Sequence, residues 1–258
     1  MIFDSHIHLD RLPTERAVEI EIEAARKVGV GRFLVPAVDR ARWSALTELA
    51  AEQPGVLLAF GLHPLAANEW DDACREELQA YLQRSGAVAV GEVGLDRFVD
   101  VPRADQEQAF REQVQVAVEV GLPLLIHCRR MPGRLLEILR EEQAQQVGGI
   151  MHAFSGSYQT ATAAIDLGFG LGFGGGITWP EAKKQIKLLR QLPDDAIVIE
   201  TDAPDMAPHP HRGESNRPAW IELILRRVAE LKGWGLDEAA AITYQNAARI
   251  LNLEMDGD

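Results

Sequence analysis

The chain predicts an α/β fold, a (β/α)8 TIM barrel, and three observations lead to this expectation. Short apolar segments alternate with helix-like segments from one end of the chain to the other. We count eight apolar segments, and eight strands alternating with helices in about 250 residues are typical of this barrel. Polar residues follow the strand ends, where barrels carry their active sites. In the alternative, an open doubly wound sheet, the first and eighth strands would lie too far apart to share a ligand.

The predicted strands are rich in Val, Ile, Leu and Phe and mostly lack alternation. This pattern is expected of parallel strands that are covered on both faces. The strands are residues 1–4, 31–38, 56–62, 87–92, 123–127, 149–154, 169–174 and 196–200.

Amphipathic segments between the strands predict the helices. Gly29 and Gly121 end two of these segments as candidate C-caps, and Pro180 stands at a helix start, where its missing N–H costs nothing. The predicted helices include residues 14–28, 105–120, 181–189, 217–232 and 236–251.

Composition indicates a soluble globular protein with one domain over residues 1–258, because hydrophobic content is 47% and charged content 25%. Cys74 and Cys128 are the only cysteines, so a disulfide framework is not expected and a reducing cytoplasm is the default location. The sequence shows neither a signal peptide nor an apolar run of the ~18 residues that a membrane span needs. We therefore expect no membrane partner, and no obligate protein partner is evident.

The formal net charge of −13 argues against broad, nonspecific affinity for nucleic acid, which usually rests on a basic surface. It does not exclude a nuclease. Two bound divalent cations would add four positive charges at the one place where a phosphate must sit.

Five histidines and two acids stand in six short motifs, most of which end an apolar segment. Six of these side chains offer the imidazole and carboxylate donors that divalent metals bind. They are His6, His8, Glu92, His127, His152 and Asp202. Six ligands exceed the three that a single catalytic zinc usually takes from a protein. The surplus suggests two ions that share a bridging carboxylate, an arrangement suited to phosphoester hydrolysis.

His6 and His8 are two positions apart, so in an extended segment both imidazoles project to the same face and can reach one ion. Asp4 and Asp10 are candidates to orient these imidazoles, although for Asp10 a helix N-cap or turn role is the preferred interpretation.

Glu92 is the candidate bridge because a carboxylate can contact two ions through its two oxygens. Its alternative role is a buried ion pair with Arg97 or Arg129. Asp96 has a weaker claim and is expected to cap a loop.

His127 and His152 end sequential strands and are assigned to the second ion. Asp202 is predicted to be both a terminal ligand and the general base that orients the attacking hydroxide. Glu200, two residues earlier, is expected to support a ligand or form an ion pair.

His63 has two interpretations, a catalytic group that binds the phosphate or protonates the leaving group, and a turn histidine held by a backbone carbonyl. Ser155 is expected to cap a helix, and Cys128 to be a buried, inert thiol. The remaining candidates are loop histidines near the substrate entrance and arginines that either contact phosphates or are solvated. They are His209, His211, Arg129, Arg130, Arg212 and Arg217.

In combination, these motifs resemble the TatD family of metal-dependent hydrolases across nearly the whole chain. The motifs are Asp4-x-His6-x-His8-Leu9-Asp10, Gly61-x-His63-Pro64, Gly91-Glu92-x-Gly94-Leu95-Asp96, His127, His152-x-Phe154-Ser155-Gly156, Glu200-Thr201-Asp202-x-Pro204 and Arg212-Gly213-x-x-Asn216-x-Pro218.

The resemblance implies an amidohydrolase-like barrel of the metal-dependent hydrolase type with deoxyribonuclease activity. It implies that His6, His8, Glu92 and Asp202 hold one ion, and that Glu92, His127 and His152 hold the other. The segment 97–100 departs from the family, which often carries tyrosine there. The segment 203–208 is closer to a TatD-like subgroup. Both departures concern substrate preference and leave the metal site intact.

The leading functional hypothesis is therefore a phosphodiesterase that cleaves DNA, from the 3′ end, by attack of a metal-bound hydroxide. The second hypothesis is a binuclear amidohydrolase acting on an amide, lactone or aminoacyl ester. The third is a non-catalytic barrel with structural ions, although no cysteine-rich cage supports it. Zn, Mg, Mn, Co and Ni all remain candidates for the two ions.

Overall fold

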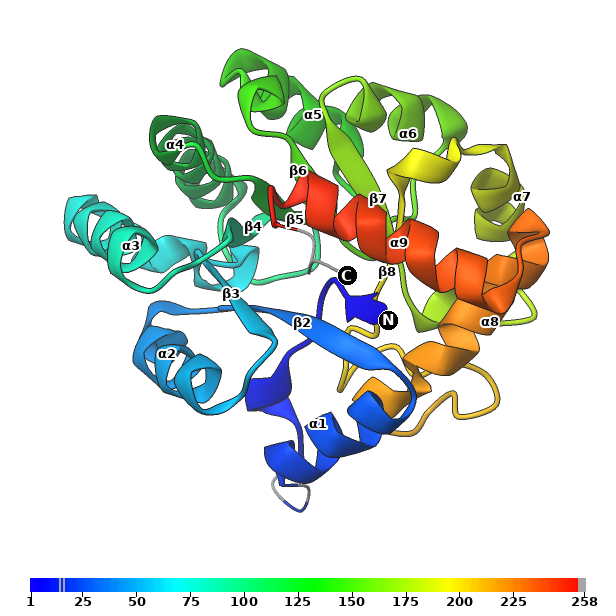
Figure 1. Ribbon diagram of the computed structural model, residues 1–258. Helices are drawn as coiled ribbons and strands as arrows, with labels where there is room; N and C mark the ends of the chain where they lie inside the picture. The colour runs from blue at the N-terminus through cyan, green and yellow to red at the C-terminus, as the bar shows by residue number, and fades with distance from the viewer. Residues whose placement is uncertain (14, 16, 255–258) are drawn as a thin grey trace.

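The computed structural model describes residues 1–13, 15 and 17–254, and its strands form one parallel eight-stranded sheet in chain order. Helices surround this sheet on its outside, as Figure 1 shows. The predicted (β/α)8 barrel is thus confirmed. The strands are β1 Ile2–Asp4, β2 Val30–Pro36, β3 Val56–Phe60, β4 Ala89–Asp96, β5 Leu124–Arg129, β6 Gly149–Met151, β7 Phe169–Phe173 and β8 Ile197–Ile199.

Of the five helices whose bounds were predicted, those at 105–120, 181–189 and 236–251 lie within two residues of their predicted bounds, whereas the helix predicted at 217–232 begins at Ile221. Short 3-10 segments join the helices to the strands. The α-helices are α1 Val18–Lys27, α2 Trp43–Glu52, α3 Asp72–Arg84, α4 Arg103–Val120, α5 Pro132–Glu141, α6 Tyr158–Ile165, α7 Lys183–Gln191, α8 Ile221–Lys232 and α9 Leu236–Ile250. None of the helices in the described ranges combines the length and the apolar character needed to cross a bilayer.

Hydrogen bonds between the first and last strands close the barrel at its C-terminal rim. The Ser5 N–H donates to the Ile199 carbonyl at 3.1 Å, and the Asp202 N–H donates to the His6 carbonyl at 2.9 Å. Asp4 accepts from the Thr201 N–H at 2.9 Å and from the Thr201 hydroxyl at 2.6 Å. Residues that are almost 200 positions apart therefore meet at one edge.

The opposite end of the barrel is filled with apolar side chains. Helix α9 lies across this end, beside the N-terminus (Figure 1). Its residues Tyr244, Ala247 and Ala248 pack on Phe3, Leu34 and other inward side chains of the strands. Because this end is closed by a packed core, polar chemistry inside the barrel is confined to the C-terminal rim.

Strand β4 differs from the prediction because it continues past Glu92 to Asp96. Its pairing with β5 has an irregularity between Gly91 and Val93, which leaves Glu92 without a partner in the register. An unpaired residue of this kind bends a strand and redirects its side chain. The prediction that the strand ends at Glu92 was wrong, but it correctly placed a break in regular pairing there.

Other predicted bounds also shift. Helix α1 begins at Val18, and the predicted start at Thr14 lies outside the described residues; Gly29 follows the helix with φ +98°. Helix α7 begins at Lys183 because residues 179–182 form a turn, which the Trp179 indole anchors by donating to the Ala207 carbonyl at 2.9 Å. Strand β6 ends at Met151, three residues early.

The barrel closure predicts a measurable loss of stability when the Thr201 hydroxyl is removed. In the Thr201→Val variant the buried Asp4 carboxyl loses its shortest hydrogen bond, and the free energy of unfolding should fall by about 1–3 kcal/mol in urea denaturation. Thr47→Val is the matched control, because the Thr47 hydroxyl bonds only to its own helix, at the Trp43 carbonyl. Equal losses in the two variants would contradict the proposed role of the closure.

Candidate metal centre

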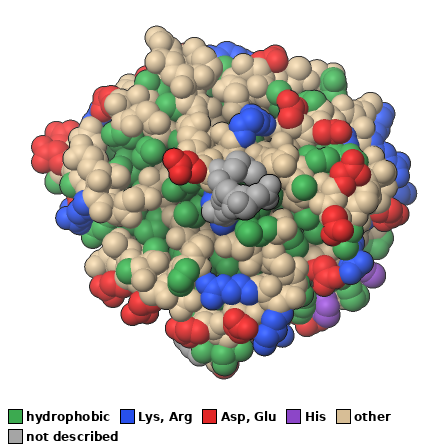
Figure 2. All heavy atoms as spheres, in the orientation of Figure 1, with side chains coloured by type: hydrophobic (Ala, Val, Ile, Leu, Met, Phe, Trp, Pro, Cys, Tyr) green, Lys and Arg blue, Asp and Glu red, His purple; other side chains and the backbone are tan. Residues whose placement is uncertain are grey.

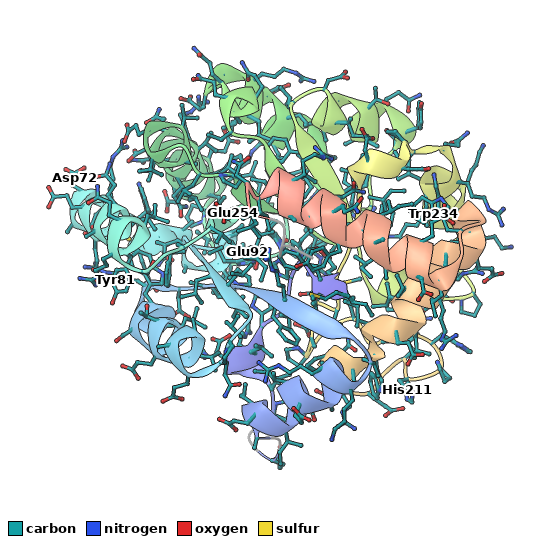
Figure 3. The ribbon with its side chains drawn as sticks, in the orientation of Figure 1. Asp72, Tyr81, Glu92, His211, Trp234 and Glu254 are labelled. Carbon is teal, nitrogen blue, oxygen red and sulfur yellow. The ribbon has the colours of Figure 1, made fainter. Side chains whose placement is uncertain are left out.

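Glu92 lies at the centre of the polar rim, and its two carboxylate oxygens face different imidazoles. Figure 3 places Glu92 near the barrel axis. Oε1 lies 2.9 Å from His127 Nδ1, 2.9 Å from His152 Nε2 and 3.8 Å from His63 Nε2. Oε2 lies 3.6 Å from the Nε2 atoms of both His6 and His8. Its contacts among the described residues are thus with imidazoles, and the alternative ion pair with Arg97 or Arg129 was wrong.

A first group of donors surrounds Oε2 of Glu92. The Nε2 atoms of His6 and His8 approach to 3.2 Å, as their two-residue spacing predicts. Asp202 Oδ1 lies 3.6 Å from His6 Nε2 and 3.7 Å from His8 Nε2. Two imidazoles and two carboxylates, contributed by β4 and by the segments that follow β1 and β8, therefore converge on one point.

A second group surrounds Oε1 of Glu92. His127 on β5 and His152 after β6 bring Nδ1 and Nε2 to within 3.1 Å of each other. Asp96 Oδ2 contacts His127 Nε2 at 3.1 Å, so the ring turns its other nitrogen toward Glu92. Asp96 also accepts the Phe98 N–H at 2.8 Å, which is the predicted loop-capping role.

Asp96 is the functional residue whose full role sequence reasoning missed. The available signal was its position on the same strand as Glu92, four residues later, because residues an even number apart face one side of a strand. A carboxylate that holds the outer nitrogen of an imidazole is a common feature around metal-binding histidines.

Glu200 lies next to the ring nitrogen of His152 that does not face Glu92, as expected of a residue that supports a ligand. Its Oε1 accepts the Ala153 N–H at 2.6 Å and lies 3.6 Å from His152 Nδ1. Gly172 makes room for this carboxylate, since a Cβ there would lie 2.3 Å from Glu200 Oε2.

Asp4, in contrast, contacts Thr201 and the backbone N–H of His6 but, among the described residues, no imidazole, so its predicted orienting role was wrong.

Burial and mutual contact set the charge states of the cluster. Burial lowers the pKa of His6 and of His8, which favours the neutral imidazole that binds metals. Burial raises the pKa of Glu92, but the imidazoles around it, His152 first, outweigh burial and hold the pKa well below its usual value. Burial raises the pKa of Asp202 to about 8, so this carboxyl holds a proton readily.

The donor set fits divalent metal ions. Three groups, each with donor atoms within 4.8 Å of one another, can be drawn from it: His6, His152 and Asp202; His6, His8 and Glu92; and His63, Glu92 and His127. Ring nitrogens that face each other at 3.1–3.2 Å, as in the pairs His6–His8 and His127–His152, need a shared hydrogen or a cation between them. Mixed nitrogen and carboxylate donors suit zinc and its neighbours.

His63 combines features of both of its predicted roles. It precedes a 3-10 segment, Pro64–Glu69, and its Nδ1 accepts the Leu65 N–H at 3.1 Å. The partner is a backbone N–H, so the expected backbone carbonyl was wrong. Because Nδ1 accepts, the neutral ring carries its hydrogen on Nε2, which faces Glu92. The ring is held by the turn and directs a donor into the site.

A cavity of about 750 Å³ opens beside the cluster, and His127, His152 and Asp202 form part of its wall. Arg129 and Arg212 also line it, and each guanidinium lies over an aromatic ring, at 4.7 Å from the centroid of Phe98 and 4.5 Å from that of Trp179. Arg129 is thus positioned for an anionic group, as one interpretation of it required, whereas Arg212 forms an ion pair with Glu181.

Two other arginines and the loop histidines take different places. Arg217 forms a two-point ion pair with Glu21, at 3.0 and 3.1 Å, away from the cavity. Arg130 lines a neighbouring hollow. His211 stacks on Trp220, with ring centroids 4.0 Å apart. Within the described chain, neither His209 nor His211 belongs to the cavity wall, although residues 204–207 and 212–214 around them do.

Three small predictions have mixed outcomes. Helix α6 is capped by Ser157, which accepts the Thr160 N–H at 3.1 Å, whereas Ser155 is exposed and lines the cavity. Cys128 is only half-buried and also lines the cavity, but burial raises its pKa to about 11, which keeps the thiol protonated. Asp10 lies in a 3-10 turn and pairs with Arg42 at 2.8 Å, as preferred.

A parallel eight-stranded barrel with five imidazoles and two carboxylates gathered at its C-terminal rim is the arrangement of a metal-dependent hydrolase. Comparison with protein families matches residues 3–252 to the family described as "TatD related DNase". The chain therefore belongs to the TatD family.

Its relatives agree with this assignment. The chain is 38% identical over 257 residues to "Uncharacterized metal-dependent hydrolase YabD" of Bacillus subtilis, covering 98% of this chain and 100% of the relative. It is similar to the crystal structure of YjjV, a TatD homologue from Escherichia coli, with TM-score 0.92, 34% identity and 98% of each chain covered. A TatD family hydrolase from Entamoeba histolytica, at 19% identity and TM-score 0.83, covers 96% of this chain and 97% of its own and shares the fold.

The hydrogen bond to His63 predicts its tautomer and its titration. Burial lowers the pKa of His63 to about 3, so in metal-free protein the ring should stay neutral, with its hydrogen on Nε2, from pH 5 to pH 8. Nitrogen NMR shifts of the imidazole measure both properties. His211, half-exposed in the loop, is the internal comparison. A His63 ring that gains a proton near its ordinary pKa of 6.5, or that carries its hydrogen on Nδ1, would contradict this geometry.

Proposed function

We propose that the protein hydrolyses phosphodiester bonds with two divalent metal ions, as a deoxyribonuclease that acts from the 3′ end of DNA. One observation carries the proposal. The Glu92 carboxylate directs one oxygen toward His6 and His8 and the other toward His127 and His152. A single carboxylate shared by two groups of imidazoles is what a pair of bridged ions requires.

Each group of donors would hold one ion. The first consists of His6, His8, Asp202 and Oε2 of Glu92. The second consists of His127 Nδ1, His152 Nε2 and Oε1 of Glu92. When bound, such a pair supplies an activated water and neutralises the charge that develops on phosphate oxygens. Zn, Mn, Co, Ni or Mg could fill these positions, and the nitrogen-rich donor set favours the first four.

The surrounding side chains account for the remaining chemistry. Asp202, buried beside His6 and His8, is placed to take the proton of the attacking water as general base. The Nε2 hydrogen of His63 points into the site and would donate to a phosphate or leaving-group oxygen. Arg129 lines the cavity beside the cluster and would bind a flanking phosphate, and Arg212, which is ion-paired with Glu181, lies on the same wall.

The substrate class is supported by charge. The wall of the site cavity includes two arginines beside three acids, Asp202, Asp205 and Glu214. Bound divalent cations would add positive charge there and, with the arginines, would attract an anionic substrate locally. The family description, "TatD related DNase", adds support for DNA. Hydrolysis of an amide, lactone or aminoacyl ester by the same donors is the competing activity.

The first test counts the ions. Elemental analysis of protein reconstituted with each metal in turn should find two ions per chain. Glu92→Gln should lower this number, because the substituted amide binds metals more weakly than the bridging carboxylate. Glu214→Gln, an exposed acid that pairs with His211, should keep both ions. A metal content of zero, with stability unchanged by chelator, would leave the proposed centre without support.

The second test compares substrates. The metal-loaded protein should shorten a 3′-accessible oligodeoxynucleotide, and His127→Ala should lower kcat by at least about a hundredfold. His209→Ala, whose imidazole lies outside the cavity wall, should leave kcat unchanged. A panel of amides, lactones and aminoacyl esters forms the parallel arm. Rapid turnover of an acyl compound with no cleavage of DNA would replace the nuclease by the competing activity.

A further inference from the structure

Helix α7 carries a concentration of positive charge that nothing described above uses. Three of the five lysines in the chain, Lys183, Lys184 and Lys187, lie on this helix together with Arg190. All four side chains are exposed, and the helix contains no acid. We call these four residues the α7 basic face. Figure 2 shows Lys and Arg side chains gathered at the right-hand edge of the molecule, where Figure 1 places α7.

The α7 basic face lacks the ion pairs that are usual on this protein. Within the described residues, none of its four side chains forms an ion pair or a hydrogen bond. The other two lysines are paired, Lys27 with Glu23 and Lys232 with Asp194.

Exposed arginines on other helices also pair with a glutamate three or four residues away. Examples are Arg103 with Glu107, and Arg226 with Glu222. On α7 the corresponding spacing joins like charges, Lys183 and Lys187, and such pairs destabilise a helix slightly. A polyanion would relieve this repulsion.

The α7 basic face continues from the wall of the site cavity. Trp179 and Arg212 line that cavity, and Trp179 stands four residues before α7 begins. Gln185, on α7 itself, also lines it and donates to the Phe154 carbonyl at 3.3 Å. The α7 basic face therefore adjoins the cavity wall through Trp179 and Gln185, and at this junction Arg212 is ion-paired with Glu181.

The dimensions suit the phosphates of one nucleic-acid strand. Lys183 and Arg190 are seven residues apart, so the basic face spans about 10 Å along the helix, at 1.5 Å per residue. Phosphates follow one another at about 3.4 Å of rise along a stacked strand, so about three phosphates fit this length.

We propose that the α7 basic face binds the phosphate backbone of the DNA strand whose end lies in the site cavity. This inference rests on the proposed nuclease function and extends it, because it assigns the path of the strand beyond the cleaved bond. An anionic membrane fits less well. Of the exposed large hydrophobic side chains in the described residues, none lies on α7, whereas membrane-surface helices insert such side chains.

The test measures binding as well as cleavage. Metal-loaded wild type and the Lys183→Gln/Lys187→Gln variant are titrated with labelled phosphorothioate single strands of 20 and 4 nucleotides across a salt series. The variant should bind the 20-mer roughly five- to tenfold more weakly at low salt. The slope of log affinity against log salt should become shallower by about 1.4, since each phosphate contact on a single strand contributes about 0.7. Binding of the 4-mer should change little.

The matched control removes two positive charges elsewhere. Lys27→Gln/Arg84→Gln changes α1 and α3 and should leave both the affinity and the salt slope at wild-type values. In cleavage assays with the unmodified 20-mer, the α7 variant should raise KM and keep kcat. Hydrolysis of bis(p-nitrophenyl) phosphate, which is too small to reach α7, should be unaffected.

Failure of this inference can be told apart from failure of the proposed function. If wild type hydrolyses neither the oligonucleotide nor the small diester, the nuclease proposal fails, and the α7 inference still stands or falls by the binding comparison. Equal binding of the 20-mer by wild type and the α7 variant overturns the inference. So does a 20-mer that binds no more tightly than the 4-mer, or an α7 variant that loses binding to phosphatidylserine vesicles but not to DNA.

Discussion

The position of the Glu92 carboxylate is the constraint on which the site depends. Glu92 sits at an irregularity between β4 and β5, out of the pairing register, and its side chain is almost fully buried among imidazoles. A buried carboxylate without counter-charge would be strongly unfavourable. The imidazoles from β5 and from the segments after β1 and β6 are therefore needed electrostatically as well as geometrically.

The closure between the two ends of the sheet makes this cluster possible. His6 and Asp202 come from opposite ends of the chain, and they meet because Asp4 binds Thr201 through both of its carboxylate oxygens. Asp4 touches no imidazole, yet it fixes the distance between the first and last strands. Residues of this kind are easily mistaken for direct supports of a metal ligand, since they occupy the same motifs.

The fold and the six donors could be predicted because both follow from local patterns. Each strand is an apolar run, and in a parallel barrel every strand ends at the same rim, so the polar residues that follow must meet. Finer contacts depend on side-chain directions that no local pattern contains. The bond from Asp96 to His127, the N–H donated to His63 and the turn before α7 are of this kind. Sequence reasoning did not single out the α7 basic face, whose position beside the cavity required coordinates.

The apolar packing beneath α9 determines how another molecule can enter and leave the barrel. The barrel is closed at the end opposite the C-terminal rim, because Tyr244 and its neighbours fill that end. A polymer therefore cannot pass through the barrel from one end to the other. Any molecule that enters the site cavity must therefore leave through the opening by which it entered.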